Sequence, residues 1–184
     1  MKKLDFNTAF NYSFNRAKGM WNILWIFLPI IGWFALGGYS VRIVKEFIKG
    51  KFKELPIFKF KSDLKLGFNM FLKSLPFVMT YIIISSILDI MDSEIADLVD
   101  LFIALFIVPM LTINFLKKET VGSYFEIEIL KYVFNNFGDY VVTLLKSILL
   151  GIVFLVMWVI LVGLPAGAFT KNMFMADFYR RRVK

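Results

Sequence analysis

The chain has 184 residues, of which 59% are hydrophobic, and its formal net charge is +8. A soluble domain is usually about 45–50% apolar, so this composition favours a membrane protein over a large soluble core. The chain contains no Cys and no His, which excludes disulfides, thiolate chemistry and the commonest general base and transition-metal ligand. We therefore expect a non-enzymatic protein with no catalytic residue, no metal site and no cofactor.

The basic residues flank the apolar runs, as expected beside anionic lipid headgroups. A lipid bilayer explains the positive charge better than nucleic acid does, so we expect no nucleic-acid partner. Residues 5–15 are polar and amphipathic, so we do not expect a cleavable signal peptide behind the basic start.

The first predicted element is an amphipathic helix from Asp5 to Lys18, with Asp5 as its N-cap. Its apolar face either lies on the membrane surface, which is the favoured interpretation, or packs on the helical bundle. That face consists of Phe6, Ala9, Phe10, Phe14, Ala17 and Trp21.

The first apolar segment runs from Trp21 to Val41 without a charged residue. A helix of this length reaches about 30 Å, the thickness of a hydrocarbon core. We expect breaks at Pro29 and Gly32 and again at Gly37 and Gly38, because these residues disfavour a helix interior. Such breaks are tolerated where neighbouring helices satisfy the freed backbone groups, so the segment should pack inside a bundle.

Two further apolar segments, residues 74–91 and 101–116, flank an acidic connection that has no Lys or Arg. They predict an antiparallel hairpin with an amphipathic stretch before its first arm and a kink at Pro109 in its second. The connection holds no EF-hand spacing and is interpreted as a solvated turn.

Residues 123–139 predict another amphipathic helix, opened by Ser123 and Glu126 as a capping box. It contains the pattern Tyr-x-Phe-Asn, which also occurs at residues 12–15. Both copies precede an apolar run, which indicates a repeated plan and approximate pseudo-symmetry.

The fourth apolar segment, residues 140–169, is the longest. Gly163, Pro165 and Gly167 should interrupt it, and a kink packed against the first segment is favoured over a Gly-x-x-x-Gly dimer face. The basic ending, residues 180–182, either contacts anionic lipid or a partner, or is a plain positive-inside stop.

Two topologies stay open. The acidic turn alone is devoid of Lys and Arg between the segments, so it should face away from the cytoplasm, and residues 42–61 should face the cytoplasm. Four spans fit the segment lengths but leave both basic termini outside. Re-entrant first and fourth segments keep every basic residue inside, and such backbone is allowed where protein buries it.

Several short motifs resemble an uncharacterised prokaryotic membrane-protein family, the domain of unknown function 4013. They are Pro29-Ile-Ile-Gly32, then Gly38-Tyr39 with Arg42, and Glu54-Leu55-Pro56. The ending, from Pro165 through Ala176 to Arg180, is also similar. The basic stretch after Pro56 departs from the acidic one that the resemblance implies. The resemblance to this family implies no catalytic or binding residues.

The sequence thus predicts one all-α domain, residues 1–184, of a multi-pass cell-membrane protein with four membrane-embedded segments and amphipathic interfacial helices. We expect a scaffold or accessory protein that binds lipid, a partner membrane protein or a second copy. The alternative is a transporter or channel component that uses the broken first and fourth segments; a lipid-modifying enzyme ranks last. The predicted break and packing residues are Pro29, Gly32, Gly37, Gly38, Gly163, Pro165 and Gly167. The predicted anionic-lipid contacts are Arg16, Lys18, Arg42, Arg180, Arg181 and Arg182.

Overall fold

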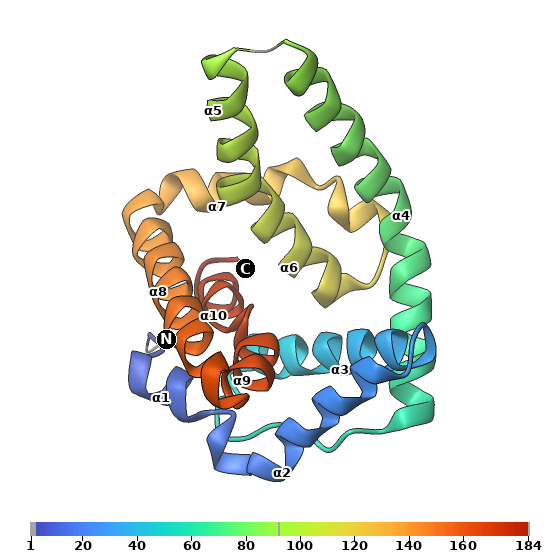
Figure 1. The fold of residues 1–184 in the computed structure, drawn as a ribbon. Helices are drawn as coiled ribbons and strands as arrows, with labels where there is room; N and C mark the ends of the chain where they lie inside the picture. Colours follow the sequence, from blue (N-terminus) through green and yellow to red (C-terminus); the bar gives the residue numbers. More distant parts are fainter. Residues whose placement is uncertain (1–2, 92, 184) are drawn as a thin grey trace.

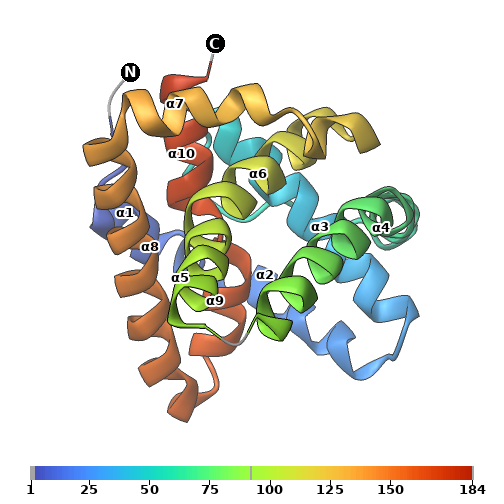
Figure 2. The same cartoon turned by 90° about the horizontal axis from the view of Figure 1, so that it is seen from above.

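The computed structural model describes residues 3–91 and 93–183, and every regular element in that part of the chain is a helix. The all-α prediction is therefore confirmed. Figure 1 shows a body of helices from which one hairpin, made of α4 (Phe60–Ile90) and α5 (Glu94–Phe102), projects. Both ends of the chain lie on one side of that body in Figure 2.

Three helical stretches in the described part are long and apolar enough to cross a membrane, judged by length and composition. They are Phe60–Ile90, Glu94–Lys118 and Phe137–Val159. The first apolar segment is not among them, because the chain turns within it and its helix, Ile31–Ile48, continues into a charged stretch with Arg42, Lys45 and Glu46.

The predicted N-terminal helix is divided as well. Its elements are α1 (Phe6–Asn11), η1 (Phe14–Arg16) and α2 (Ala17–Met20). Asp5 caps α1 by accepting a hydrogen bond from the Thr8 backbone N–H at 2.8 Å. The Phe10 ring stacks on Phe154 with centroids 5.6 Å apart, and Phe6 stacks on Phe174. The apolar face of α1 thus packs on the protein itself, the alternative to a face resting on lipid.

The first apolar segment consists of a 3-10 helix, η2 (Trp21–Phe27), a turn, and α3 (Ile31–Ile48). The chain turns through residues 28–30, where Ile30 has a φ of 64°. Gly37 and Gly38 lie in the uninterrupted interior of α3, so the predicted second break is wrong.

Gly38 instead permits a close helix crossing. A Cβ at Gly38 would lie 1.9 Å from the Asp63 carbonyl oxygen, and one at Gly67 would lie 1.8 Å from the Phe34 carbonyl oxygen. No side chain fits between such closely approaching backbones, so α3 and α4 cross with glycine on both sides. Phe34 adds an edge-on contact with Phe68, with centroids 5.3 Å apart.

The hairpin returns through α5, a π-helical turn η3 (Ile103–Ile107) and α6 (Val108–Lys118). Ser93 caps α5 by accepting a hydrogen bond from the Ala96 backbone N–H. Pro109 lies in the first turn of α6, where its missing N–H costs little. The irregularity in this arm is the π-helical turn η3, just before Pro109, where the sequence predicted a kink.

The single helix expected over residues 123–139 is not formed. The chain there holds η4 (Val121–Tyr124), η5 (Ile127–Ile129) and α7 (Leu130–Asn135), and the next helix begins at Phe137. The Ser123 hydroxyl donates to the Thr120 carbonyl, while Glu126 accepts from Asn114 and Lys118. The predicted capping box is therefore wrong, because the Ser123 hydroxyl turns back to a carbonyl three residues before it and Glu126 bonds to residues of α6.

The last part of the chain turns back on itself. It contains α8 (Phe137–Val156), η6 (Met157–Ile160), α9 (Gly163–Thr170) and α10 (Met173–Arg182). The interruption lies at residues 157–162, where Leu161 has a φ of 61°. Gly163, Pro165 and Gly167 lie within α9, so the break predicted at these residues is displaced towards the N-terminus. Gly163 packs tightly on α8, since a Cβ there would lie 2.0 Å from the Phe154 carbonyl oxygen.

Candidate functional site

Both termini are joined to α8 by a charged network, which we call the terminal clasp (Lys3, Asp139, Asp177, Arg181 and Arg182). Arg181 donates to Asp139 at 2.6 Å and to Asp177 at 2.8 Å, while Lys3 pairs with Asp139 at 2.8 Å. The Arg182 Nε also donates to Asp139 at 2.8 Å. Burial alone would lower the pKa of Arg181. Its hydrogen bonds to Asp139 and Asp177 outweigh burial and hold the pKa above its usual value. The clasp therefore keeps the Arg181 guanidinium charged. It also joins Lys3, the start of α8 and the end of α10.

A second charged pair joins α3 to α4. Asp63 is completely buried and accepts from Arg42 through both of its oxygens, at 2.5 and 2.7 Å. Its second oxygen also accepts from the Lys59 backbone N–H at 2.7 Å. Arg42 donates in addition to the Ile57 carbonyl at 2.7 Å. A bidentate pair with these further bonds fixes both helix orientation and the connection before α4.

A third polar group lies between α6 and α10. The buried Tyr179 hydroxyl donates to the Asn114 side-chain oxygen at 2.7 Å. The Asn114 amide donates to the Ser123 carbonyl at 2.8 Å and to Glu126 at 3.0 Å. Burial raises the pKa of Tyr179 to about 12, so the phenol stays protonated as a donor at neutral pH.

These networks engage most of the arginines expected to contact anionic lipid. Arg42, Arg181 and Arg182 are bound to carboxylates, and Arg180 pairs with Asp177 at 2.5 Å. Arg16 is half-buried and donates to the Leu55 carbonyl, whereas Lys18 is exposed. Four of these arginines therefore pair with carboxylates that sequence reasoning missed, and Arg16 bonds to a backbone carbonyl.

Contacts near these networks bring together the residues that flank the first segment, the hairpin and the fourth segment. Asn15 donates to the Lys53 carbonyl at 2.7 Å and Arg16 to the Leu55 carbonyl at 3.1 Å, across the first segment. Lys73 donates to the Glu119 carbonyl at 2.9 Å, across the hairpin. Asp139 and Arg181 close the fourth segment. Three apolar loops thus leave and re-enter one charged end of the molecule.

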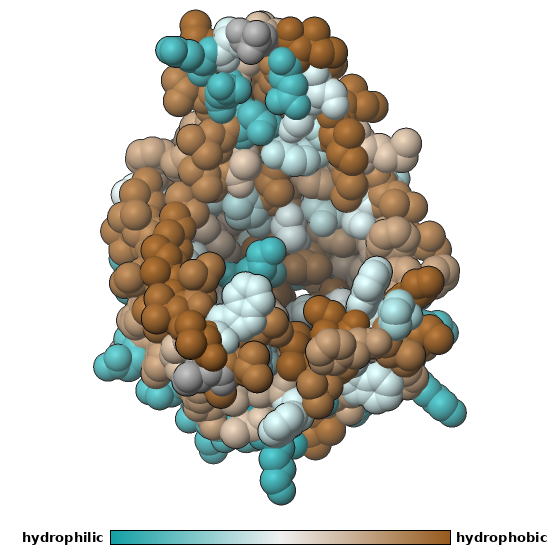
Figure 3. Space-filling model, viewed as in Figure 1, coloured by the Kyte–Doolittle hydropathy of each residue, from teal (hydrophilic) through white to brown (hydrophobic). Residues whose placement is uncertain are grey.

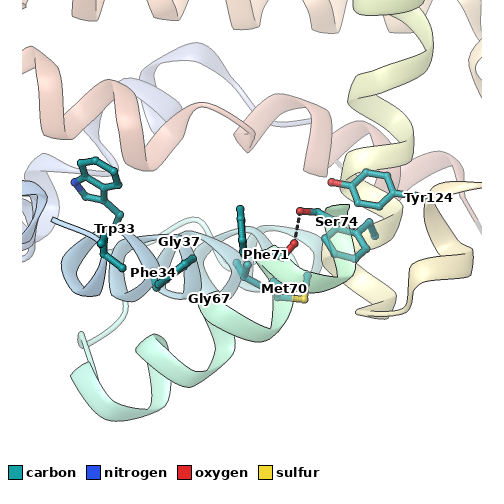
Figure 4. Close-up of a pocket in the computed structure, with 11 residues that line it drawn as sticks. Trp33, Phe34, Gly37, Gly67, Met70, Phe71, Ser74 and Tyr124 are labelled. Atoms are coloured by element: carbon teal, nitrogen blue, oxygen red, sulfur yellow. Dashed lines mark hydrogen bonds between the residues drawn. The ribbon is translucent and has the colours of Figure 1, made fainter. Parts of the chain in front are cut away.

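An apolar groove of about 580 Å³ lies between α3, α4 and the η4 region. Figure 4 shows Trp33 and Tyr124 at its opposite ends with Phe71 between them. The Ser74 hydroxyl donates back to the Phe71 carbonyl at 2.8 Å, so it is already satisfied. Gly37, whose added Cβ would meet no atom within 4 Å, opens on the groove. The arrangement suits an apolar chain or side chain rather than a polar substrate.

Apolar residues cover most of the face in Figure 3, and hydrophilic residues gather at the hairpin end and along the opposite edge.

Among the described residues no group of three or more Asp, Glu, His or Cys side chains is placed to hold a metal ion. Two of the predicted packing residues lie in separate places: Gly38 lies at the crossing of α3 and α4, and Gly163 lies against α8.

The family model for DUF4013, a protein family of unknown function, matches residues 22–163. The chain belongs to this family. Pro29, Arg42 and the Glu54–Pro56 turn lie in the matched range of this DUF4013 protein, and the Arg42–Asp63 pair lies there too. The α10 arginines of the terminal clasp lie beyond the matched range. No curated protein and no solved structure matches the chain, so its function is inferred from its own residues.

Proposed function

We propose that the chain is a non-enzymatic multi-pass protein of the cell membrane, which acts as a scaffold or accessory protein by binding lipid or a partner membrane protein. The observation that carries this proposal is the separation of the molecule into one charged, internally paired end and three apolar loops. A bilayer offers both environments, water with headgroups at one level and hydrocarbon beyond it.

In this proposal four segments are membrane-embedded, and the first and fourth are re-entrant. The pairs Asn15–Lys53 and Asp139–Arg181 support re-entrance, because each joins the start of a segment to its end. The turns at residues 28–30 and 157–162 are largely exposed, but backbone groups there bond within the chain, as membrane depth requires. The Leu28 N–H donates to the Trp25 carbonyl at 3.1 Å, and the Leu161 N–H donates to the Trp158 carbonyl at 2.8 Å. The basic residues then face the cytoplasm, and the acidic turn after α4 faces outward.

Single cysteines in this cysteine-free chain test the topology. Lys18→Cys, Lys61→Cys and Glu94→Cys replace exposed side chains before the first segment, before the hairpin and at its far end. With an impermeant thiol reagent, we expect Glu94→Cys to react in intact cells, and the other two only in inside-out vesicles. Reaction of Lys18→Cys and Lys61→Cys from opposite sides would mean that the first segment spans the membrane.

A transporter or channel component is the second candidate. Its supporting observation is that η2 of the first segment contacts α9 of the fourth, so that two interrupted segments lie side by side, as in carriers with broken helices. Flux of ions or small solutes into liposomes holding the purified protein separates the candidates. If the protein is a scaffold, solute should enter these liposomes no faster than it enters liposomes without protein. Saturable flux would favour transport. Native mass measurement of the same preparation reports whether a second copy is bound.

A further inference from the structure

A second groove, of about 280 Å³, lies between α8 and the returning helices α9 and α10. Gly151 and Phe154 line it from α8, Gly167 from α9 and Phe174 from α10. The two glycines leave space along its floor, since a Cβ at Gly151 would meet no atom within 4 Å and one at Gly167 would only touch Phe154. The groove therefore has room for a thin apolar chain between two helices.

Two lysines lie at or beside this groove. Lys171 follows the last residue of α9 and lines the groove directly. The Lys146 Nζ lies 5.9 Å from the ring centroid of Phe174, which also lines the groove. No carboxylate among the described residues lies within salt-bridge distance of either lysine, in contrast to the paired arginines of the terminal clasp. A charge on an apolar segment is costly unless it is paired, so such a position calls for an anion.

The groove is polar at one end only. Ser147 lies beside Lys146 at the charged end, and α8 then runs past Gly151 to Phe154, towards the irregular tip at residues 157–162. The Ser147 hydroxyl donates to the Thr143 carbonyl at 3.0 Å, so it is already committed. Headgroup selection at that end therefore depends on the lysine charges rather than on hydroxyl donors.

We propose that this groove binds one anionic phospholipid, with its phosphate between Lys146 and Lys171 and one acyl chain along Gly151 and Gly167. The proposal rests on the proposed function and names the lipid class and the place of binding. A cationic end beside an apolar trough matches an anionic headgroup and its chain, whereas a peptide segment needs polar backbone partners that the trough does not offer.

The test uses the full chain in detergent with equimolar phosphatidylglycerol and phosphatidylcholine, and native mass measurement of the retained lipid. We expect the parent to prefer phosphatidylglycerol by about tenfold or more, since each lysine near a lipid surface favours an anion. Lys146→Gln with Lys171→Gln should abolish this preference. Gly151→Leu should fill the trough and remove the retained lipid of both kinds.

Lys65→Gln with Lys131→Gln is the matched charge control, because both side chains are exposed and lie away from the groove. Gly138→Leu is the matched glycine control, since a Cβ there also meets no atom within 4 Å. Both controls should retain phosphatidylglycerol like the parent, and circular dichroism with thermal unfolding checks that every variant is folded.

Three results would overturn the proposal: an unchanged preference in the double glutamine variant, full lipid retention in Gly151→Leu, or displacement of the lipid by inorganic phosphate alone, which would indicate a free-anion site. Failure of the proposed function looks different. In that case the parent leaves the membrane fraction on washing, or gives saturable solute flux, whatever these variants retain.

Discussion

The charged end and the projecting hairpin are stabilised in different ways. At the charged end Ile43 is 1% exposed beside the Arg42–Asp63 pair, so its side chain is enclosed by protein. On the hairpin Ile83 is 58% exposed, although both belong to apolar helices of one chain. Protein packing holds the first region, and lipid is the expected solvent of the second. Hydrophobic residues there are spread around the helix rather than gathered on one face, as expected for a surface in hydrocarbon.

The largest expected effect comes from Asp63→Ala at the charged end. It leaves Arg42 without its buried carboxylate, and breaking such a pair costs about 3 kcal/mol, the low end of the usual range because Arg42 is 24% exposed. Thermal unfolding in detergent should show a clear drop in the midpoint. Lys51→Gln, which removes an exposed pair with Glu46, is the control and should change little. Equal stability of the two variants would mean that the pair does not hold the α3–α4 crossing.

Truncating one isoleucine in each region tests directly whether protein packing holds the charged end but not the hairpin. Ile43→Ala leaves a cavity in packed protein and should cost about 2–3 kcal/mol, the lower part of the usual range. Ile83→Ala removes atoms that face outward, so the cost in the free energy of unfolding should stay within about 0.5 kcal/mol. Chemical denaturation of both variants in the same detergent gives the two values. Comparable losses would show that the hairpin is packed against protein in the native assembly.

Adjacent glycines in α3 test the helix crossing. Gly38→Ala forces apart the backbones of α3 and α4 and should cost about 1–3 kcal/mol. Gly37→Ala places its methyl group in open space, so it should be neutral or stabilise α3 by up to about 1 kcal/mol through helix propensity. The thermal midpoints of the two variants should therefore move in opposite directions or differ strongly. A loss in both would mean that the groove beside Gly37 closes in the folded protein.

Features encoded within a few residues were predictable from the sequence. The apolar runs predicted an all-helical fold with helices long and apolar enough to cross a membrane, and Asp5 was identified as the cap that it forms. A cap and an apolar run depend only on neighbours three or four residues away. The limit appears at the predicted capping box, where Glu126 bonds to Asn114, 12 residues away, and the Ser123 hydroxyl turns back to Thr120.

Features that depend on distant parts of the chain were not predictable. Asp177 accepts from the Leu4 backbone N–H, 173 residues away, and nothing near either residue marks the pairing. Gly38 looked like a helix break because a glycine needed for close approach and one that ends a helix have the same sequence signal. The partner of Arg42 was hidden in the same way, because Asp63 lies 21 residues away.

The smallest effect concerns the hydrogen bond between α6 and α10. Tyr179→Phe removes the donor to the Asn114 oxygen, and a single buried hydrogen bond contributes about 1 kcal/mol. The Asn114 amide keeps its bonds to Ser123 and Glu126, so the loss should stay near that value rather than spread through the group. Tyr132→Phe, at a half-buried ring on α7, is the matched control. Thermal unfolding of the two variants should show a small drop for Tyr179→Phe alone. A drop several times larger would mean that the bond holds α10 in place for the terminal clasp, and the charged end would then unfold as one cooperative unit.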